Sequence, residues 1–255
     1  MIFAGFVKNT LLDYPGRVAS TVFTGGCDLR CIFCHNPHLM EQGPSIIPED
    51  EILSYMRKRQ GLIDALCISG GEPTMQADLI PFLKRAREVV RYIKLDTNGT
   101  RPDILREVSH KSLADYVAMD IKTDRKRYPE ICGVGGMQQS DTGSGLTGMP
   151  GAAGTSGTGF EIEKIDESID LIMGGAFPGY EFRTTVVAEY YDEDVASAVG
   201  TRLQGAERYA LQYFEDGDDI PAGRGILHKR SRAEMESYAA ILRQYVKEVV
   251  IRGGN

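Results

Sequence analysis

The segment ASTVFTGGCDLRCIFCHNP, residues 19–37, joins a β-branched run to three closely spaced cysteines. Residues 19–24 have the composition of a strand, and the cysteines follow directly where that strand is expected to end. Cys27, Cys31 and Cys34 have a C-x3-C-x2-C spacing. This spacing is too close for a structural disulfide network, and it lets three thiolates face one point, so it indicates a single metal centre.

Strand candidates alternate with helix candidates along the rest of the chain. The strands are expected at 19–24, 65–69, 92–96, 115–120, 181–187 and 207–213, and the helices at 48–60, 76–90, 101–109, 162–174, 192–203 and 231–247. Residues 3–7 are expected to pair at an edge of the sheet. Alternating strands and helices form βαβ crossovers and a parallel sheet. Six such units predict an α/β fold that is either a doubly wound sheet or an incomplete barrel.

The composition is that of an ordinary globular protein. The chain has 255 residues, of which 42% are apolar and 25% charged, and its net charge is −7. No apolar run approaches the length of a membrane-spanning helix, and no basic field is present to hold nucleic acid or an anionic membrane. The five cysteines are an odd number, and the first residues lack a secretory signal pattern. We therefore expect a cytoplasmic protein with no nucleic-acid or membrane partner.

Residues 133–159 interrupt the alternation of strands and helices. They hold ten of the 29 glycines and only one charged residue, Asp141. Such a stretch cannot bury enough apolar surface to offset the entropy of ordering it. Because strand and helix patterns resume after it, we predict a single domain over residues 1–255 with a flexible insertion at 133–159.

The three-cysteine set leaves more than one metal open. Structural zinc sites usually have four ligands, and His35 or His38 would complete one. A cubane iron–sulfur cluster held by three cysteines keeps one iron open for another ligand, whereas an iron–sulfur electron carrier normally uses four. A zinc-stabilised binding protein and an electron carrier are therefore the non-enzyme alternatives. Cys67 is expected to be buried in its strand, and the place of Cys132 beside the glycine-rich stretch leaves room for an exposed thiol.

The C-x3-C-x2-C motif, with Phe33 before its last cysteine, resembles the signature of the radical S-adenosylmethionine (radical SAM) enzymes. This resemblance implies an incomplete (β/α)6 parallel barrel in which Cys27, Cys31 and Cys34 hold a [4Fe–4S] cluster and the open iron binds S-adenosylmethionine (SAM). The segment Gly70, Gly71, Glu72 and Pro73 resembles the family's GGEP segment, which contacts the methionine amino group. Two residues without side chains there let a ligand approach the backbone closely.

Further segments resemble the branch of the family that activates glycyl radical enzymes. These segments are Cys34-His35-Asn36-Pro37, Asp96-Thr97-Asn98-Gly99 and Asp120-Ile121-Lys122. The resemblance implies that Phe33, His35, Asp96, Asp120 and Lys122 belong to the cofactor site and that a monovalent cation binds near Asp96 and Asp120. Arg183, on the fifth expected strand, matches an arginine that contacts the cofactor. No catalytic residue is expected beyond the cluster and the cofactor.

The segments 11–17 and 180–187 resemble the proteins that activate anaerobic, class III, ribonucleotide reductase. The implied reaction is reductive cleavage of SAM to a 5′-deoxyadenosyl radical, which abstracts a hydrogen from a glycine of that partner enzyme. A one-electron donor such as flavodoxin or ferredoxin is implied. The alternatives within the family are another target, such as a glycyl radical enzyme of the pyruvate formate-lyase type, or a small molecule.

Overall fold

The computed structural model describes residues 1–133 and 161–254, which form one eight-stranded sheet in the order β1 to β8. The strands are β1 (Phe3–Thr10), β2 (Ala19–Thr24), β3 (Ala65–Gly70), β4 (Tyr92–Thr97), β5 (Tyr116–Asp120), β6 (Gly179–Val186), β7 (Arg208–Tyr213) and β8 (Glu248–Arg252). β1 runs antiparallel to β2, and every later neighbour pair is parallel. The predicted partial parallel barrel is confirmed, with one strand more than expected.

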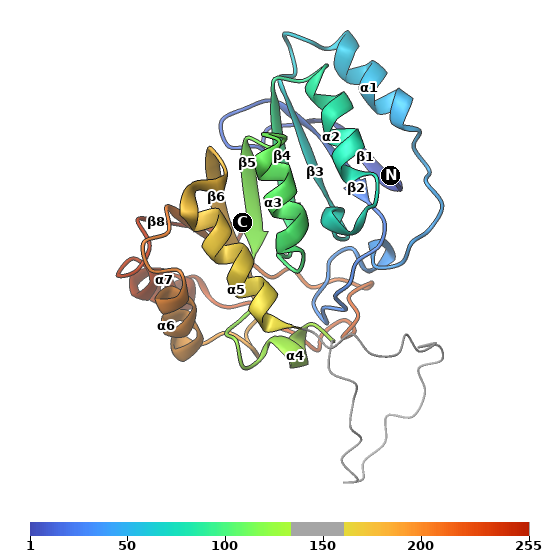
Figure 1. Ribbon diagram of the computed structural model, residues 1–255. Coiled ribbons are helices and arrows are strands. Elements are labelled where there is room, and N and C mark those ends of the chain that lie inside the picture. The colour runs from blue at the N-terminus through green and yellow to red at the C-terminus, as the bar shows by residue number, and fades with distance from the viewer. Residues whose placement is uncertain (134–160, 255) are drawn as a thin grey trace.

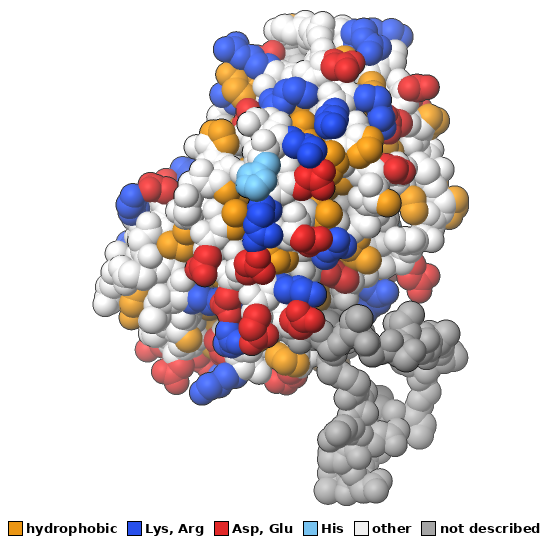
Figure 2. Space-filling model, viewed as in Figure 1, with side chains coloured by type: hydrophobic (Ala, Val, Ile, Leu, Met, Phe, Trp, Pro, Cys, Tyr) orange, Lys and Arg blue, Asp and Glu red, His pale blue; other side chains and the backbone are white. Residues whose placement is uncertain are grey.

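Helices connect the parallel strands and cover the outside of the sheet. They are α1 (Glu49–Lys58), α2 (Leu79–Arg87), α3 (Pro102–His110), α4 (Tyr128–Ile131), α5 (Ile162–Leu171), α6 (Glu193–Arg202) and α7 (Arg232–Leu242). Figure 1 shows α2, α3 and α5 lying over one face of the sheet. On this helical face, Lys, Arg, Asp and Glu side chains are interspersed (Figure 2), so both signs of charge meet solvent there.

The alternation of side chains along each strand separates an apolar face from a polar one. Leu66 and Ile68 of β3 and Ile93 and Leu95 of β4 are fully buried in the main hydrophobic core. The residues between them point to the opposite face of the sheet, because the side-chain period of a strand is two. Lys94 is one of these residues, so the inner face of the barrel carries charge.

An aromatic cluster closes the barrel at the amino ends of its strands. Tyr14 packs with Ala19, Ala65 and Cys67, and the rings of Tyr92 and Tyr116 contact the same cluster. The cysteine motif follows the carboxyl end of β2 and is therefore at the other end of the barrel. The segment 11–17, which carries part of the family resemblance, thus serves the fold at a distance from the cysteines.

The carboxyl-terminal part of the chain differs from the expectation. The helix predicted over 231–247 ends at Leu242, and residues 248–252 form β8. A capping box between Ser231 and Glu234 fixes the start of α7. The predicted helix over 162–174 is α5, followed by a π-helical turn over Ile172–Ala176. Of the predicted insertion at 133–159, all but Gly133 is outside the described residues, and the single-domain organisation stays a prediction.

None of the helices in residues 1–133 and 161–254 combines the length and the apolar character needed to cross a membrane.

Candidate active site

Loops at the carboxyl ends of β2 to β6 surround one cavity of about 200 Å³. Twelve of the thirteen predicted site residues line it; the exception is Glu72. The lining residues predicted from sequence are Cys27, Cys31, Phe33, Cys34, His35, Gly70, Gly71, Pro73, Asp96, Asp120, Lys122 and Arg183. The lining also includes residues that were not predicted, among them Asn36, Met40, Ser69, Asn98 and Thr185.

The cysteine loop is fixed at its base by backbone hydrogen bonds. The Gly26 N–H donates to the Leu39 carbonyl oxygen at 2.8 Å, and the Cys27 N–H donates to the Met40 carbonyl at 3.1 Å. Cys31 is buried, Cys27 and Cys34 are partly buried, and all three are free thiols. The loop therefore directs three sulfur atoms toward one cavity from a base that the fold holds in place.

The donor set fits an iron–sulfur centre. Three thiols within eight residues are the ligands that such clusters use. Among the described residues, no three His, Cys, Asp or Glu side chains stand together as a metal-binding group. Burial raises the pKa of Cys27 to about 12 and also raises that of Cys34. Because thiolates are the metal-binding form of cysteine, metal binding at these residues releases protons.

A strap from the end of α4 holds the middle of the cysteine loop. The Arg30 N–H donates to the Cys132 carbonyl at 2.8 Å, and the Ile32 N–H donates to the Ile131 carbonyl at 3.1 Å. Gly133 has φ of +61°, and a side chain there would crowd the Arg30 backbone. Cys132 is fully buried, which corrects the suggestion of an exposed thiol. Sequence reasoning missed this strap because it depends on a contact across about a hundred residues.

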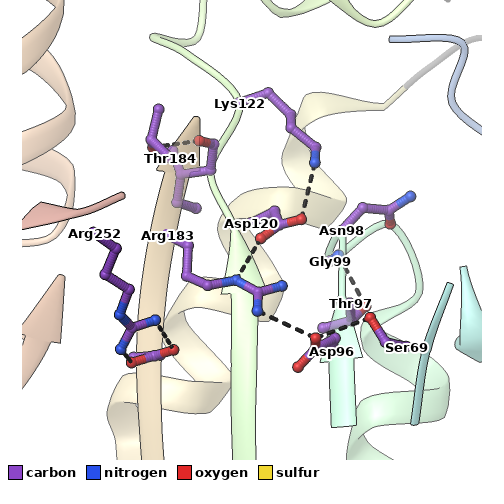
Figure 3. A network of polar contacts seen from close by, with 12 residues as sticks. Ser69, Asp96, Thr97, Asn98, Gly99, Asp120, Lys122, Arg183, Thr184 and Arg252 are labelled. Carbon is purple, nitrogen blue, oxygen red and sulfur yellow. Dashed lines mark hydrogen bonds and ion pairs between the residues drawn. The ribbon is translucent and has the colours of Figure 1, made fainter. Parts of the chain in front are cut away.

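Alternating charges from three neighbouring strands form a network at the cavity floor (Figure 3). Arg183 of β6 lies between two carboxylates: its Nε is 2.8 Å from Asp120, and one of its terminal nitrogens is 3.2 Å from Asp96. The Lys122 Nζ is 2.9 Å from Asp120, and Lys94 pairs with Asp96. Lys94 was not predicted, although its position two residues before Asp96 puts both side chains on the same face of β4.

The cations of this network keep its carboxylates ionised. Burial alone would raise the pKa of Asp96 and Asp120, but the neighbouring Arg183 and the lysines hold both pKa values below their usual range. The same pairing raises the pKa of Lys122 and Arg183 against the effect of burial. The cavity floor thus presents fixed positive and negative groups side by side. Arg183 already bridges the carboxylates of Asp96 and Asp120, and the monovalent cation near them stays a prediction.

Gly70 and Gly71 are needed for contact between backbone segments. Gly70 has φ of +118°, and a Cβ there would overlap the backbone of Thr24. A Cβ on Gly71 would overlap the Gly26 carbonyl of the cysteine loop. The sequence suggested that these two glycines let a ligand approach the backbone closely. In the structure they let two backbone segments of the protein pack against each other, and both glycines also line the cavity.

Glu72 is fully buried and its carboxylate lies outside the cavity lining. It accepts hydrogen bonds from the Thr74 N–H at 3.0 Å, the Thr97 hydroxyl at 2.8 Å and the Asn98 N–H at 2.6 Å. Burial, reinforced by the nearby Asp28, raises the pKa of Glu72 to about 7. The side chain therefore joins the turn after β3 to the turn after β4, while its predicted contact with the cofactor stays a prediction.

Phe33 and His35 border the cavity in different ways. Phe33 is buried in the main core, whereas His35 lies at the surface and packs its ring 5.6 Å from that of Phe214. Partial burial of the imidazole lowers the pKa of His35, which favours its neutral form. A neutral imidazole at the rim of the cavity is able to accept or donate a hydrogen bond.

A profile of the Radical SAM superfamily matches residues 21–141 of the chain. A protein of Methanocaldococcus jannaschii that is provisionally named a glycyl-radical enzyme activating enzyme is 29% identical over 253 residues. That alignment covers 98% of this chain and 95% of the relative. The similarity therefore includes the cysteine motif, the network strands and the carboxyl-terminal strands.

Other curated relatives match about half of the chain. The pyruvate formate-lyase-activating enzyme of Clostridium pasteurianum is 33% identical over 132 residues, covering 49% of this chain and 54% of the relative. A protein of Pyrococcus abyssi provisionally named a GTP 3′,8-cyclase is 32% identical over 128 residues, covering 48% of this chain and 42% of the relative. This chain thus aligns with about half the length of each of these two relatives.

Among solved structures, SuiB of Streptococcus suis bound to S-adenosylmethionine superposes with a TM-score of 0.62 at 13% identity. The superposition covers 90% of this chain and 49% of SuiB. At this identity the likeness concerns the fold alone, and it extends over nearly all of the chain.

Proposed function

Because this chain belongs to the radical SAM superfamily and is a radical SAM enzyme, we propose that Cys27, Cys31 and Cys34 hold its [4Fe–4S] cluster and that the adjoining cavity binds SAM. When bound and reduced, the cluster supplies the electron that splits SAM into methionine and a 5′-deoxyadenosyl radical. The observation that carries the proposal is the convergence of the three cysteines and the charge network on one cavity. The network comes from β4, β5 and β6, far from the cysteines in sequence.

The residues of the cavity floor suit the amino-acid end of SAM, which has an ammonium and a carboxylate. Lys122 and Arg183 are the cations able to hold the carboxylate, and Asp96 and Asp120 are the anions able to hold the ammonium. Gly70, Gly71 and Pro73 line the wall beside the cysteine loop. Fixed charges of both signs orient such a ligand without rearrangement at the moment of reaction.

The proposed target is a glycine in a partner glycyl radical enzyme. Similarity over nearly the full length to a protein named as an activating enzyme supports it, as does the shorter match to the pyruvate formate-lyase-activating enzyme. Anaerobic ribonucleotide reductase is the partner we propose first, because of the resemblance of the segments 11–17 and 180–187. We propose flavodoxin or ferredoxin as the one-electron donor.

The experiment begins with anaerobic reconstitution of the full chain with iron and sulfide. After reduction with dithionite, SAM should yield 5′-deoxyadenosine, measured by chromatography. Cys31→Ala should abolish both the cluster and the product, whereas the matched control Cys67→Ala, at a cysteine outside the cavity lining, should retain them. An intact cluster that gives no 5′-deoxyadenosine would overturn the proposed SAM cleavage.

The target is tested by mixing the reduced enzyme and SAM with candidate partners. A glycyl doublet in the electron paramagnetic resonance spectrum, formed on anaerobic ribonucleotide reductase, supports the first choice. A doublet only on another glycyl radical enzyme changes the partner. The match to a GTP 3′,8-cyclase favours small-molecule chemistry as a second candidate; SAM cleavage stimulated by GTP, with no doublet on any partner, would establish it.

A further inference from the structure

Asn98, in the turn after β4, is oriented so that its amide nitrogen faces the cysteine loop. Its Oδ1 accepts two hydrogen bonds from Thr100, from the backbone N–H at 3.0 Å and from the hydroxyl at 2.7 Å. With that oxygen occupied, the Nδ2 donates to the Asp28 carboxylate at 2.8 Å and to the Cys27 sulfur at 3.9 Å. Only 5% of the residue is exposed, so water competes little for these contacts.

Glu72 supports this turn from behind. The Asn98 N–H donates to one Glu72 carboxylate oxygen at 2.6 Å, and the Thr97 hydroxyl donates to the other at 2.8 Å. Because Glu72 is fully buried and also held by Thr74, it ties the turn after β4 to the turn after β3. The position of the Asn98 amide is therefore set by two independent groups, Thr100 at its side chain and Glu72 at its backbone.

The amide donates to two groups that stand beside each other, the Cys27 sulfur and the Asp28 carboxylate. The Cys27 sulfur is 3.9 Å from the Asp28 carboxylate. Cysteine binds iron as a thiolate, which a carboxylate at this distance repels. An amide that donates to both groups offsets that repulsion.

We infer that Asn98 is a positioning residue for the metal centre, which holds the Cys27 sulfur against the repulsion of Asp28 and raises the reduction potential of the cluster bound there. The inference rests on the proposed function, because it assumes that Cys27 is a cluster ligand. Hydrogen bonds to cluster sulfurs are among the groups that set such potentials, and they stabilise the more negative, reduced state. Glu72 and Thr100 act through Asn98.

The test compares three variants of the anaerobically reconstituted full chain. Asn98→Asp keeps the shape and the acceptor for Thr100 but replaces the donor by an acceptor. Thr100→Val removes one of the two bonds that orient the amide. Asn9→Ala, at an exposed asparagine on β1 that bonds to Tyr55, is the matched control. The readouts are the midpoint potential, from a redox titration followed by electron paramagnetic resonance, and the iron content per chain.

We expect Asn98→Asp to lower the equilibrium constant for one-electron reduction by at least about tenfold, which corresponds to about 59 mV. Thr100→Val should lower it by a smaller factor, and Asn9→Ala should leave it unchanged. An Asn98→Asp protein with full iron content and the wild-type potential would overturn the inference. If Asn98→Asp binds no iron, Thr100→Val decides, and a wild-type potential in that variant overturns the inference.

The failure of this inference is distinguishable from that of the proposed function. Wild-type protein that binds no iron through its three cysteines overturns the cluster assignment and the inference with it. Wild-type protein that binds the cluster and cleaves SAM, with unshifted potentials in both turn variants, overturns only the role of Asn98.

Discussion

Replacing Arg183 by Met should destabilise the metal-free protein, because the guanidinium joins two carboxylates at the cavity floor. Arg183 has 15% of its side chain exposed, Asp96 13% and Asp120 28%. After the substitution, Asp96 keeps Lys94 as its partner and Asp120 keeps Lys122. The variant thus turns a network with an excess of positive charge into two separate pairs.

The expected decrease in the free energy of unfolding lies between two limits. Breaking a fully buried ion pair by removing one partner costs about 3–5 kcal/mol, and losing an exposed pair costs about 0–1 kcal/mol. Because these side chains are partly exposed and each carboxylate retains one lysine, we expect the free energy of unfolding to fall by about 2 kcal/mol. Urea unfolding at pH 7, followed by far-ultraviolet circular dichroism, measures it if the m-values agree. The control is Arg106→Met, which breaks the exposed pair with Glu167 and should cost less than about 0.5 kcal/mol.

The same variant has a predicted dependence on pH. Although burial works in the opposite direction, the cations lower the pKa of Asp96 and Asp120 in the folded state. Carboxylates with a lowered pKa add stability above their unfolded pKa of about 3.9, and this contribution is lost as pH falls through the folded value. The loss in the free energy of unfolding caused by Arg183→Met should therefore be complete at pH 7 and become smaller below about pH 4. A deficit under about 0.5 kcal/mol at pH 7, or one that grows in acid, would refute this account.

Three further predictions concern the turn after β3 and the cysteine loop. Gly71→Ala should lower the free energy of unfolding by at least about 2 kcal/mol in urea, because its Cβ overlaps the Gly26 carbonyl, and a loss within the error of the measurement would contradict that clash. Cys31→Ala should leave no cluster iron after anaerobic reconstitution while Cys67→Ala retains it, and equal iron contents would remove Cys31 from the ligand set. Because burial raises the pKa of Glu72 to about 7, the folded state keeps a proton that the unfolded state loses above about pH 4. Stability should therefore fall between about pH 4 and 7, and Glu72→Gln should gain up to about 3 kcal/mol relative to wild type over that range in urea unfolding; parallel pH profiles would count against this pKa.

The positions of the parallel strands β2 to β7 were predictable because each one is a short apolar run followed by a helical pattern, while their order in the sheet followed only from the family resemblance. β8 was not predicted, since Glu248–Arg252 follows a stretch with no glycine or proline to mark the end of α7. Tertiary pairing fixes the start of β8: the Lys247 N–H donates to the Ala206 carbonyl, and the Glu248 N–H donates to the Glu207 carbonyl. Such a pairing becomes visible only when β7 is already in place.

The site was predictable to the extent that its residues stand at the ends of strands. Asp96 is the second-last residue of β4 and Asp120 is the last of β5, and parallel strands bring their carboxyl ends to one rim. The contacts that join the loops to one another were not predictable. Asn98 reaches Cys27 and Cys132 lies against the cysteine loop only because turns far apart in the sequence share this rim.

Gly70 and Gly71 show why a correctly predicted site residue does not by itself establish a ligand. The sequence suggested that they admit a cofactor, and the structure uses them to seat β3 against β2 and the cysteine loop. The Gly71 N–H donates to the Thr24 carbonyl, and the Glu72 N–H donates to the Gly26 carbonyl, both at 2.8 Å. A substitution at either glycine would therefore disturb the fold and the cavity together. The charge network is the better probe of cofactor binding, because Lys122 follows the end of β5 and its side chain can be changed while β4, β5 and β6 retain their backbone pairing.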